Sequence, residues 1–406
     1  MTSVAALFNN VESFMAYLKE HGLKVQNYSG LYIVKAQDQS DVELLQKEDL
    51  KGLIYKVVED QARAEVVCTG VKVPLEELPI DATPCKVQRA HDGVTFRLYH
   101  TDDGLGVSTN GMIYPNRGWG PRGCRTFIDM YADVSCQVDE EQLNPDWCYY
   151  ATMEHMDHTN ICKHTENKLI LTRICDRTTL RDVPLSEAKG FKHVVQEWTG
   201  LDEMQSEIKR VQSSECKKEP VCDVGLLVYL QDGTVRLETA SYKRAAQIKP
   251  NLADPRQHWT HLVQGRSSEL GNMEDLWNEL GTRCEEYLLY FPWHRDTFGE
   301  MTSLFSDLVQ DLYDDYLEVY THGFKSVHLP ARHVNYQRAL AKDFYDTVDI
   351  CTLAWHLLEQ DSKRIYYLMN PDNIPPKRRD DPSSDTDTKP DAMHTTVDTK
   401  AGTMCV

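Results

Sequence analysis

Short apolar runs separated by polar turns extend to about residue 240, a pattern typical of β-strands. The clearest runs cover residues 31–34, 52–58, 94–99, 149–154, 168–175 and 226–230. The dipeptides Asp103-Gly104 and Asp232-Gly233 predict hairpins, because these residues suit the tight turns that join antiparallel strands. An amphipathic helix is expected within residues 1–22, with Gly22 as its stop, and the polar segment 185–217 is expected to be mostly helical.

Beyond about residue 272, apolar residues recur every three or four positions, which is the period of a helix. They include Met301, Leu304, Phe305, Leu308, Leu312, Tyr316 and Val319, and later Phe344, Val348, Cys351, Trp355 and Leu358. From Pro371 onward, Pro, Asp, Ser and Thr dominate, and such a segment buries too little apolar surface to fold. The sequence therefore predicts an α+β domain over 1–270, a small all-helical domain over 271–370 and a disordered tail over 371–406.

Charge and composition narrow the functional classes. The chain has 44 Lys and Arg against 63 Asp and Glu, a formal charge of −19, which disfavours a protein that coats nucleic acid and leaves room for a local basic groove. Twelve cysteines without a C-x-x-C pair are typical of reduced thiols. No apolar run approaches the roughly 20 residues of a membrane span, and no signal-peptide pattern begins the chain, so a cytoplasmic or virion-associated protein is expected.

The segment from Ala90 to Tyr99 contains Asp92-Gly93 followed by Arg97 on a predicted strand. It resembles the Lys-x-Asp-Gly-x-x-x-Arg element of the covalent nucleotidyltransferases, which comprise DNA ligases, RNA ligases and capping enzymes. In that superfamily the lysine amine attacks the α-phosphate of a nucleotide. Here Ala90 stands at the lysine position and has no nucleophilic atom.

Four further segments resemble elements of RNA ligases of phages and large DNA viruses, and together with the Ala90 segment they occur in the order of that family. They are the strand after Lys51-Gly52, the hairpin that ends at Ser108-Thr109, the strand that ends at Glu154 and the hairpin over residues 226–239. The resemblance implies a two-sheet ligase-like nucleotidyltransferase domain followed by a helical domain. It also implies nucleotide-binding roles for Asp92, Gly93, Arg97, Glu154 and Arg236.

Three charged positions of the family pattern are altered together. The nucleophilic lysine is Ala90, the metal-holding glutamate is Val224, and the second lysine of a Lys-x-Lys pair is Glu238, with Arg236 at the first. A carboxylate facing a triphosphate repels it. The sequence thus predicts no catalytic residue at the usual place and no metal ligand, while an active enzyme would need ATP and Mg²⁺.

Two local alternatives remain. Lys86 is the fallback nucleophile, since it shares a strand face with Ala90, but four residues place it about 13 Å away and favour a surface role. Asp92, Gly93 and Arg97 could instead shape the strand and its turn, with Arg97 paired to an internal acid. Structural zinc is a weaker alternative, suggested by the loose spacing of Cys148, His155, His158, Cys162 and His164.

Three functional hypotheses follow. The first is an RNA-ligase-like protein without catalysis that binds RNA or nucleotide, or acts as a scaffold with viral or host proteins. The second is an active ATP-dependent RNA ligase that uses a displaced lysine. The third is an unrelated structural or regulatory protein.

Overall fold

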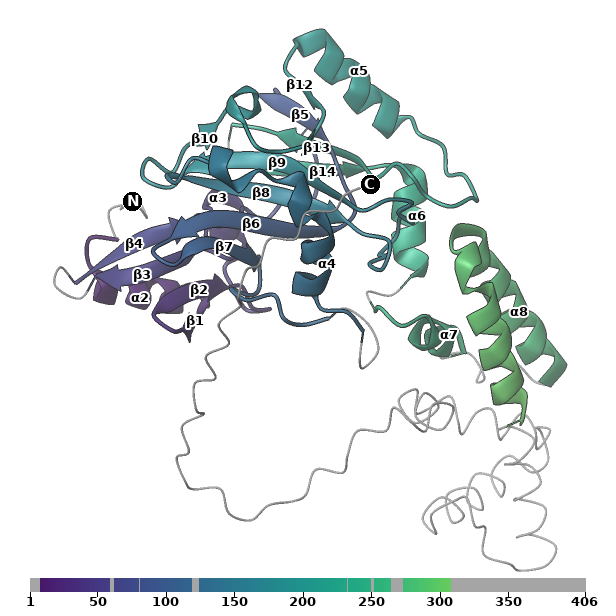
Figure 1. Cartoon of the computed structure of the whole chain (residues 1–406). Coiled ribbons are helices and arrows are strands. Elements are labelled where there is room, and N and C mark those ends of the chain that lie inside the picture. Colours follow the sequence, from purple (N-terminus) through teal and green to yellow (C-terminus); the bar gives the residue numbers. More distant parts are fainter. Residues whose placement is uncertain are drawn as a thin grey trace, which may run out of the picture.

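The computed structural model describes residues 8–58, 62–79, 81–118, 124–231, 233–249, 252–263 and 273–307. They form an α+β architecture of three sheets with helices around them (Figure 1), which confirms the predicted class. Two of these sheets and part of the third surround the cleft considered below.

The N-terminal sheet has four antiparallel strands in the order β1-β2-β3-β4. Its strands and helices are β1 (Lys24–Tyr28), β2 (Leu31–Lys35), β3 (Ile54–Val58), β4 (Arg63–Cys68), α2 (Val11–Glu20) and α3 (Val42–Lys47). Phe14, Leu18 and Leu45 from the helices pack with Val34 and Tyr55 of the sheet in one core. Beyond α2, Gly22 has φ +69°, a conformation that favours glycine and ends the helix as predicted.

The central sheet has the order β10-β9-β8-β6-β7, with β11 paired to β9. Its strands are β6 (Val94–Thr101), β7 (Gly104–Thr109), β8 (Trp147–Glu154), β9 (Lys168–Asp176), β10 (Asp182–Val183) and β11 (His193–Val194). The Asp103-Gly104 turn joins β6 and β7 as predicted. Helix α4 (Phe127–Val134) packs Met130 and Val134 into the core on one face, and the short helices η2 (Ser135–Gln137), η3 (Glu140–Gln142) and η4 (Leu185–Glu187) lie in its connections.

The third sheet has the order β12-β5-β13-β14 and brings together strands distant in sequence. Its strands are β5 (Lys86–Arg89), β12 (Glu197–Trp198), β13 (Gly225–Tyr229) and β14 (Thr234–Glu238). Helix α5 (Leu201–Gln212) covers one face through Met204 and Val211. The expectation of a mostly helical segment over 185–217 is wrong outside α5, because the first half runs as short extended pieces that pair with β9 and β5.

Helices follow the third sheet and lie beside the sheets in Figure 1. They are α6 (Ala240–Ile248), α7 (Pro255–Val263), α8 (Met273–Tyr290) and η5 (Pro292–His294), with helical backbone continuing over 295–307. Trp259, Tyr287, Phe291 and Phe305 form an aromatic core that also includes Ala90 of the sheet domain. The predicted helical residues from 308 to 370 and the predicted tail lie outside the described residues. Among the described helices, none is long and apolar enough to cross a bilayer.

Candidate functional site

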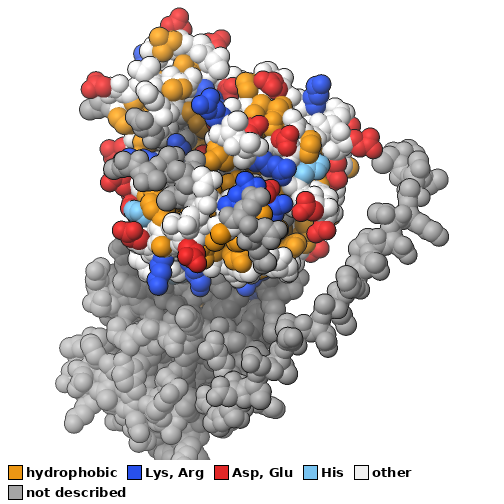
Figure 2. Space-filling view, turned by 90° about the vertical axis from the view of Figure 1, so that its left-hand side faces the viewer, with side chains coloured by type: hydrophobic (Ala, Val, Ile, Leu, Met, Phe, Trp, Pro, Cys, Tyr) orange, Lys and Arg blue, Asp and Glu red, His pale blue; other side chains and the backbone are white. Residues whose placement is uncertain are grey.

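A cleft of about 660 Å³ opens between the central and third sheets, and the segments before β3 and after β4 of the N-terminal sheet also line it. Its lining includes six Lys or Arg residues and two Asp residues, an excess of four positive charges in a chain of formal charge −19. The basic residues are Lys51, Lys72, Arg89, Arg173, Arg181 and Arg236. Figure 2 shows one outer face, with Lys and Arg side chains near its middle and Asp and Glu side chains common around its edge. A cationic concave site attracts anionic ligands.

Ala90 lies in the wall of this cleft, directly after β5. Its N–H donates to the carbonyl of Gly225 at 2.9 Å, which holds it against the adjacent strand. The residue is 4% exposed, and its methyl group packs in the same core as Val224 and Tyr242. The position predicted for the nucleophile therefore lies in the wall of the cleft and carries only an apolar group.

Asp92 is placed by the structure in a buried network and is not part of the cleft lining. Its carboxylate accepts hydrogen bonds from the backbone N–H groups of Ile161 and Cys162, both at 2.7 Å, from the hydroxyl of Tyr242 at 3.0 Å and from Asn160 Nδ2 at 3.2 Å. These donors come from the loop after β8 and from α6. The carboxylate therefore joins both segments to the start of β6.

Gly93 lines the cleft, and its lack of a side chain is required by the adjacent strand. A Cβ atom added there would lie 2.2 Å from the carbonyl oxygen of Met153 in β8. Only glycine allows β6 and β8 to begin their pairing at this separation.

Arg97 is fully buried and lies outside the cleft lining. It donates to three carbonyl oxygens, those of Gly52, of Thr109 at 2.6 Å and of Thr69 at 3.4 Å. The expected pairing of Arg97 with an internal acid is wrong, since backbone carbonyls take the place of the acid. The guanidinium joins the loops that flank β3 and β4 to the end of β7 and so fixes the N-terminal sheet against the central one.

Glu154 ends β8 as predicted and pairs with His91, with 2.8 Å between Oε1 and Nδ1. His164 Nδ1 lies 4.0 Å from Oε2 on the other side of the carboxylate. Burial pushes the pKa of Glu154 upward, but the His91 hydrogen bond and the nearby charges of His91, His164 and Lys168 outweigh it and lower the pKa. The carboxylate is thus held ionised beside two imidazoles.

Arg236 lines the cleft from β14 and is partly neutralised. Its Nε lies 3.1 Å from Glu238 Oε1, and its Nη2 donates to the Tyr242 hydroxyl at 2.9 Å. The guanidinium also lies over the Tyr242 ring at 5.2 Å. Glu238 therefore pairs with the neighbouring arginine, while Val224, at the predicted metal position, is 4% exposed and packs in an apolar core. An apolar side chain cannot hold Mg²⁺.

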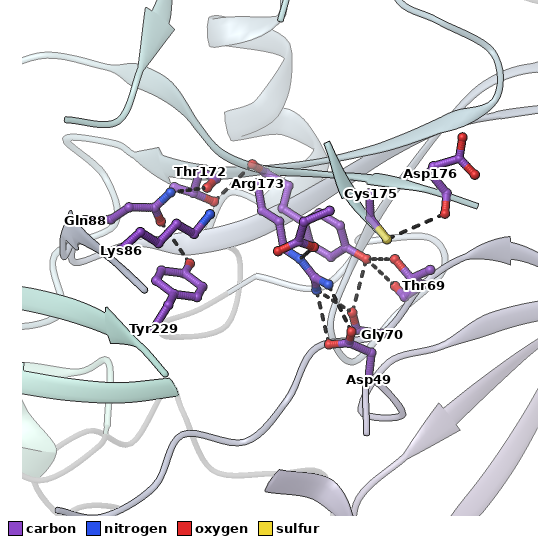
Figure 3. A network of polar contacts seen from close by, with 12 residues as sticks. Asp49, Thr69, Gly70, Lys86, Gln88, Thr172, Arg173, Cys175, Asp176 and Tyr229 are labelled. Carbon is purple, nitrogen blue, oxygen red and sulfur yellow. Dashed lines mark hydrogen bonds and ion pairs between the residues drawn. The ribbon is translucent and has the colours of Figure 1, made fainter. Parts of the chain in front are cut away.

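Arg173 on β9 organises the far wall of the cleft, and sequence reasoning did not single it out. It binds both carboxylate oxygens of Asp49, at 2.9 and 3.2 Å, and its Nε donates to Asp182 at 2.7 Å. Tyr150, whose ring lies under the guanidinium, donates to the Thr69 carbonyl at 2.7 Å. Figure 3 shows this network linking the loop at Asp49 to the central sheet. No sequence signal marks it, because its hydrogen-bonded partners are separated by up to 124 positions.

Lys86, the fallback nucleophile, lies outside the cleft lining and is already paired. Its Nζ is 3.4 Å from Glu197 Oε2 and 4.5 Å from the centre of the Tyr229 ring. Gln88, fully buried on the same strand face, joins Tyr229 to the carbonyl of Thr172 (Figure 3). Lys86 thus belongs to a half-buried polar cluster between sheets.

Lys51 and Lys72 line the cleft together with Ala90. Neither has an ion-pair partner within 4 Å in the described part of the chain. In this respect their amines resemble the guanidinium groups of Arg89 and Arg181, which also line the cleft without an ion pair among the described residues.

The histidines suggested as zinc ligands have other contacts. His155 Nε2 lies 3.1 Å from Asp133, and burial lowers the pKa of His158 to about 4. Within the described ranges, no group of three His, Cys, Asp or Glu side chains has the geometry to hold a metal ion.

Solved structures of ATP-dependent ligases show similarity to this chain at low identity. No protein-family model and no curated protein sequence matches it. An archaeal ATP-dependent RNA ligase is similar with a TM-score of 0.41 at 11% identity, over 76% of this chain and 83% of that chain. An RNA ligase of Naegleria gruberi is similar with a TM-score of 0.28 at 14% identity, over 55% of this chain and 76% of that chain.

Proposed function

We propose that this chain is an RNA-ligase-like protein whose cleft binds a nucleotide or a phosphorylated RNA end without forming a lysyl-nucleotide. One observation carries the proposal: the cleft concentrates positive charge around an alanine at the position where the sequence pattern expects the nucleophile. Binding needs cationic groups facing the phosphates, which the lining provides. Covalent transfer needs a nucleophilic atom at that wall, which Ala90 lacks.

The metal position supports the same proposal. In the pattern that the sequence resembles, a glutamate holds the metal ion, and here Val224 is buried among apolar side chains. Without a carboxylate at position 224, a divalent cation has no ligand from that side chain. We therefore assign the cleft a binding role, and we infer a scaffolding function, with viral or host proteins as partners, from that loss of chemistry.

The primary test uses α-labelled ATP, and separately GTP, with Mg²⁺ or Mn²⁺. We expect reversible binding and no label that survives denaturation. The triple variant Ala90→Lys, Val224→Glu, Glu238→Lys is expected to gain a covalent label, because the lysine Nζ can then form a bond to the α-phosphorus while the bond to pyrophosphate breaks. Labelled wild-type protein would defeat the proposed loss of catalysis.

Charge in the cleft is tested separately. The double variant Lys51→Gln, Lys72→Gln is expected to weaken ATP binding at least about tenfold, since charge-assisted contacts to phosphate are the strongest polar contacts available. The double variant Lys189→Gln, Lys192→Gln is the matched control, because both lysines are exposed and lie outside the cleft lining. Equal loss in both variants would show that the effect is one of net charge and not of this cleft.

A second function is favoured by the position of Lys51 and Lys72 in the same cleft lining as Ala90. Either amine could serve as a displaced nucleophile in an active ATP-dependent ligase. Mass spectrometry of any labelled peptide would identify the lysine. Of the variants Lys51→Arg and Lys72→Arg, the one that removes that lysine would then lose the label. If label forms and both variants keep it, this second proposal fails.

A further inference from the structure

His91 lies on the crossover between β5 and β6 and lines the cleft next to Ala90. Glu154, at 2.8 Å from its Nδ1, does not line the cleft. Because the carboxylate is ionised, Nδ1 carries the proton and donates a hydrogen bond to Oε1. This bond fixes the orientation of the ring and leaves Nε2 as the nitrogen that Glu154 does not bind. The carboxylate is thus turned toward the imidazole and not toward the cleft.

His91 Nε2 is shielded from water and has no hydrogen-bond partner among the described residues. The same is true of Nε2 of His164, whose side chain is only 8% exposed. Buried polar atoms are nearly always paired, so an unpaired nitrogen in the wall of a cleft indicates a group that a ligand would satisfy. Of the two imidazoles beside Glu154, only His91 lines the cleft.

The charge around His91 selects the kind of ligand. The charged groups that act on the Glu154 carboxylate are His91 itself, His164 in the loop after β8 and Lys168 on β9. With Nδ1–H held by Glu154, a second proton on Nε2 gives an imidazolium that donates to two anions, the carboxylate and a ligand oxygen. The cationic lining favours a phosphate as that second anion.

We propose that His91 is a phosphate-binding residue of the cleft and that Glu154 is a positioning residue that acts through it. The inference rests on the proposed nucleotide-binding function and adds the group that makes the contact. It reassigns Glu154, which the sequence pattern places against the ligand itself, to the support of His91.

The test measures ATP affinity of the full chain by calorimetry in the absence of divalent cations. His91→Gln is expected to bind about tenfold more weakly than wild type, because an amide cannot make a charge-assisted hydrogen bond to a phosphate oxygen. Glu154→Gln is expected to weaken binding in the wild-type background and to have no further effect in the His91→Gln background, since it acts through that imidazole. Lys189→Gln is expected to leave the affinity unchanged.

Equal weakening by Glu154→Gln in the wild-type and His91→Gln backgrounds would overturn the positioning role of Glu154. Unchanged affinity in His91→Gln with intact wild-type binding defeats this inference alone. No wild-type binding defeats the proposed function as well. Nitrogen-15 NMR of the wild-type protein needs no variant. ATP is expected to shift the imidazole nitrogen signals of His91, and two unshifted nitrogen signals under saturating ATP would contradict the proposal.

Discussion

Arg236 and Glu238 lie two positions apart on β14, with their side chains 3.1 Å apart at the edge of the cleft. The acid that stands where the family pattern has a lysine therefore neutralises the arginine beside it. This pairing lowers the positive charge available to a ligand, and it makes Glu238 the residue whose removal should strengthen binding.

Glu238→Gln is expected to tighten ATP binding by about two- to tenfold, because Arg236 becomes free to contact phosphate and one repulsive charge is lost. Both side chains are partly exposed, at 36% and 25%, so solvent screening limits the gain. Fluorescence or calorimetric titration measures it. Glu219→Gln, on an exposed acid outside the cleft lining, should change affinity little; equal gains in both variants would contradict the local explanation.

Asp92→Asn is expected to destabilise the fold by about 2–4 kcal/mol, since a buried carboxylate with four donors is replaced by an amide that cannot accept from all of them. Urea unfolding gives the change in free energy. The matched control is Asp102→Asn, whose side chain is 92% exposed and whose loss should cost less than about 0.5 kcal/mol. A stable Asp92→Asn protein that has lost ATP binding would instead assign Asp92 to the ligand.

Gly93→Ala is expected to cost about 1–3 kcal/mol or more, because the new methyl group meets the Met153 carbonyl in the β6–β8 pairing. Gly299→Ala is the control, for which a change in stability of the opposite sign is expected. Gly299 lies in helical backbone with no neighbour within 4 Å of an added Cβ, so alanine should stabilise it by up to about 1 kcal/mol. Thermal and chemical unfolding of both variants distinguish the two effects, and a neutral Gly93→Ala would show that the strands can separate without loss.

The helical region should be sensitive to acid through His258 and His294. Burial lowers the pKa of His258 to about 3 and that of His294 to about 4, and both rings are hydrogen-bonded to Tyr287. The unfolded chain binds protons near pH 6.5 while these folded rings do not, so stability is full above pH 6.5 and falls as the pH drops toward 4.

Each of the two histidines should contribute a slope of up to about 1.4 kcal/mol per pH unit in that range. Urea unfolding at a series of pH values, followed by circular dichroism, measures the slope for wild type and for His294→Gln. The His294→Gln variant should lose the part of the slope that His294 contributes. An identical slope in both proteins would assign the acid sensitivity to other groups.

Local sequence patterns predicted the strands and hairpins because these depend on residues close in the chain. The Asp103-Gly104 turn, the strand ending at Glu154 and the stop at Gly22 are of this kind. The cleft was predictable only through the resemblance of the Ala90 to Arg97 segment to a known pattern.

The polar contacts that hold the cleft were not predictable. Arg173 meets Asp49 across 124 positions, and Asp92 meets Tyr242 across 150, so neither partner is marked by spacing. The segment 185–217 looked helical because its polar composition carries no strand pattern, yet pairing to β9 and β5 determines its backbone. Tertiary partners outweigh local propensity in such short edge pieces.

Each residue of the Asp92-Gly93-Arg97 signature has a structural task. Asp92 holds a loop and a helix, Gly93 permits two strands to approach, and Arg97 connects two sheets. None of these tasks depends on a reactive nitrogen at position 90. A motif search built on this signature therefore selects chains that share these contacts of the fold. Whether such a chain has the nucleophilic lysine depends on the residue two places before the aspartate, which must be inspected separately.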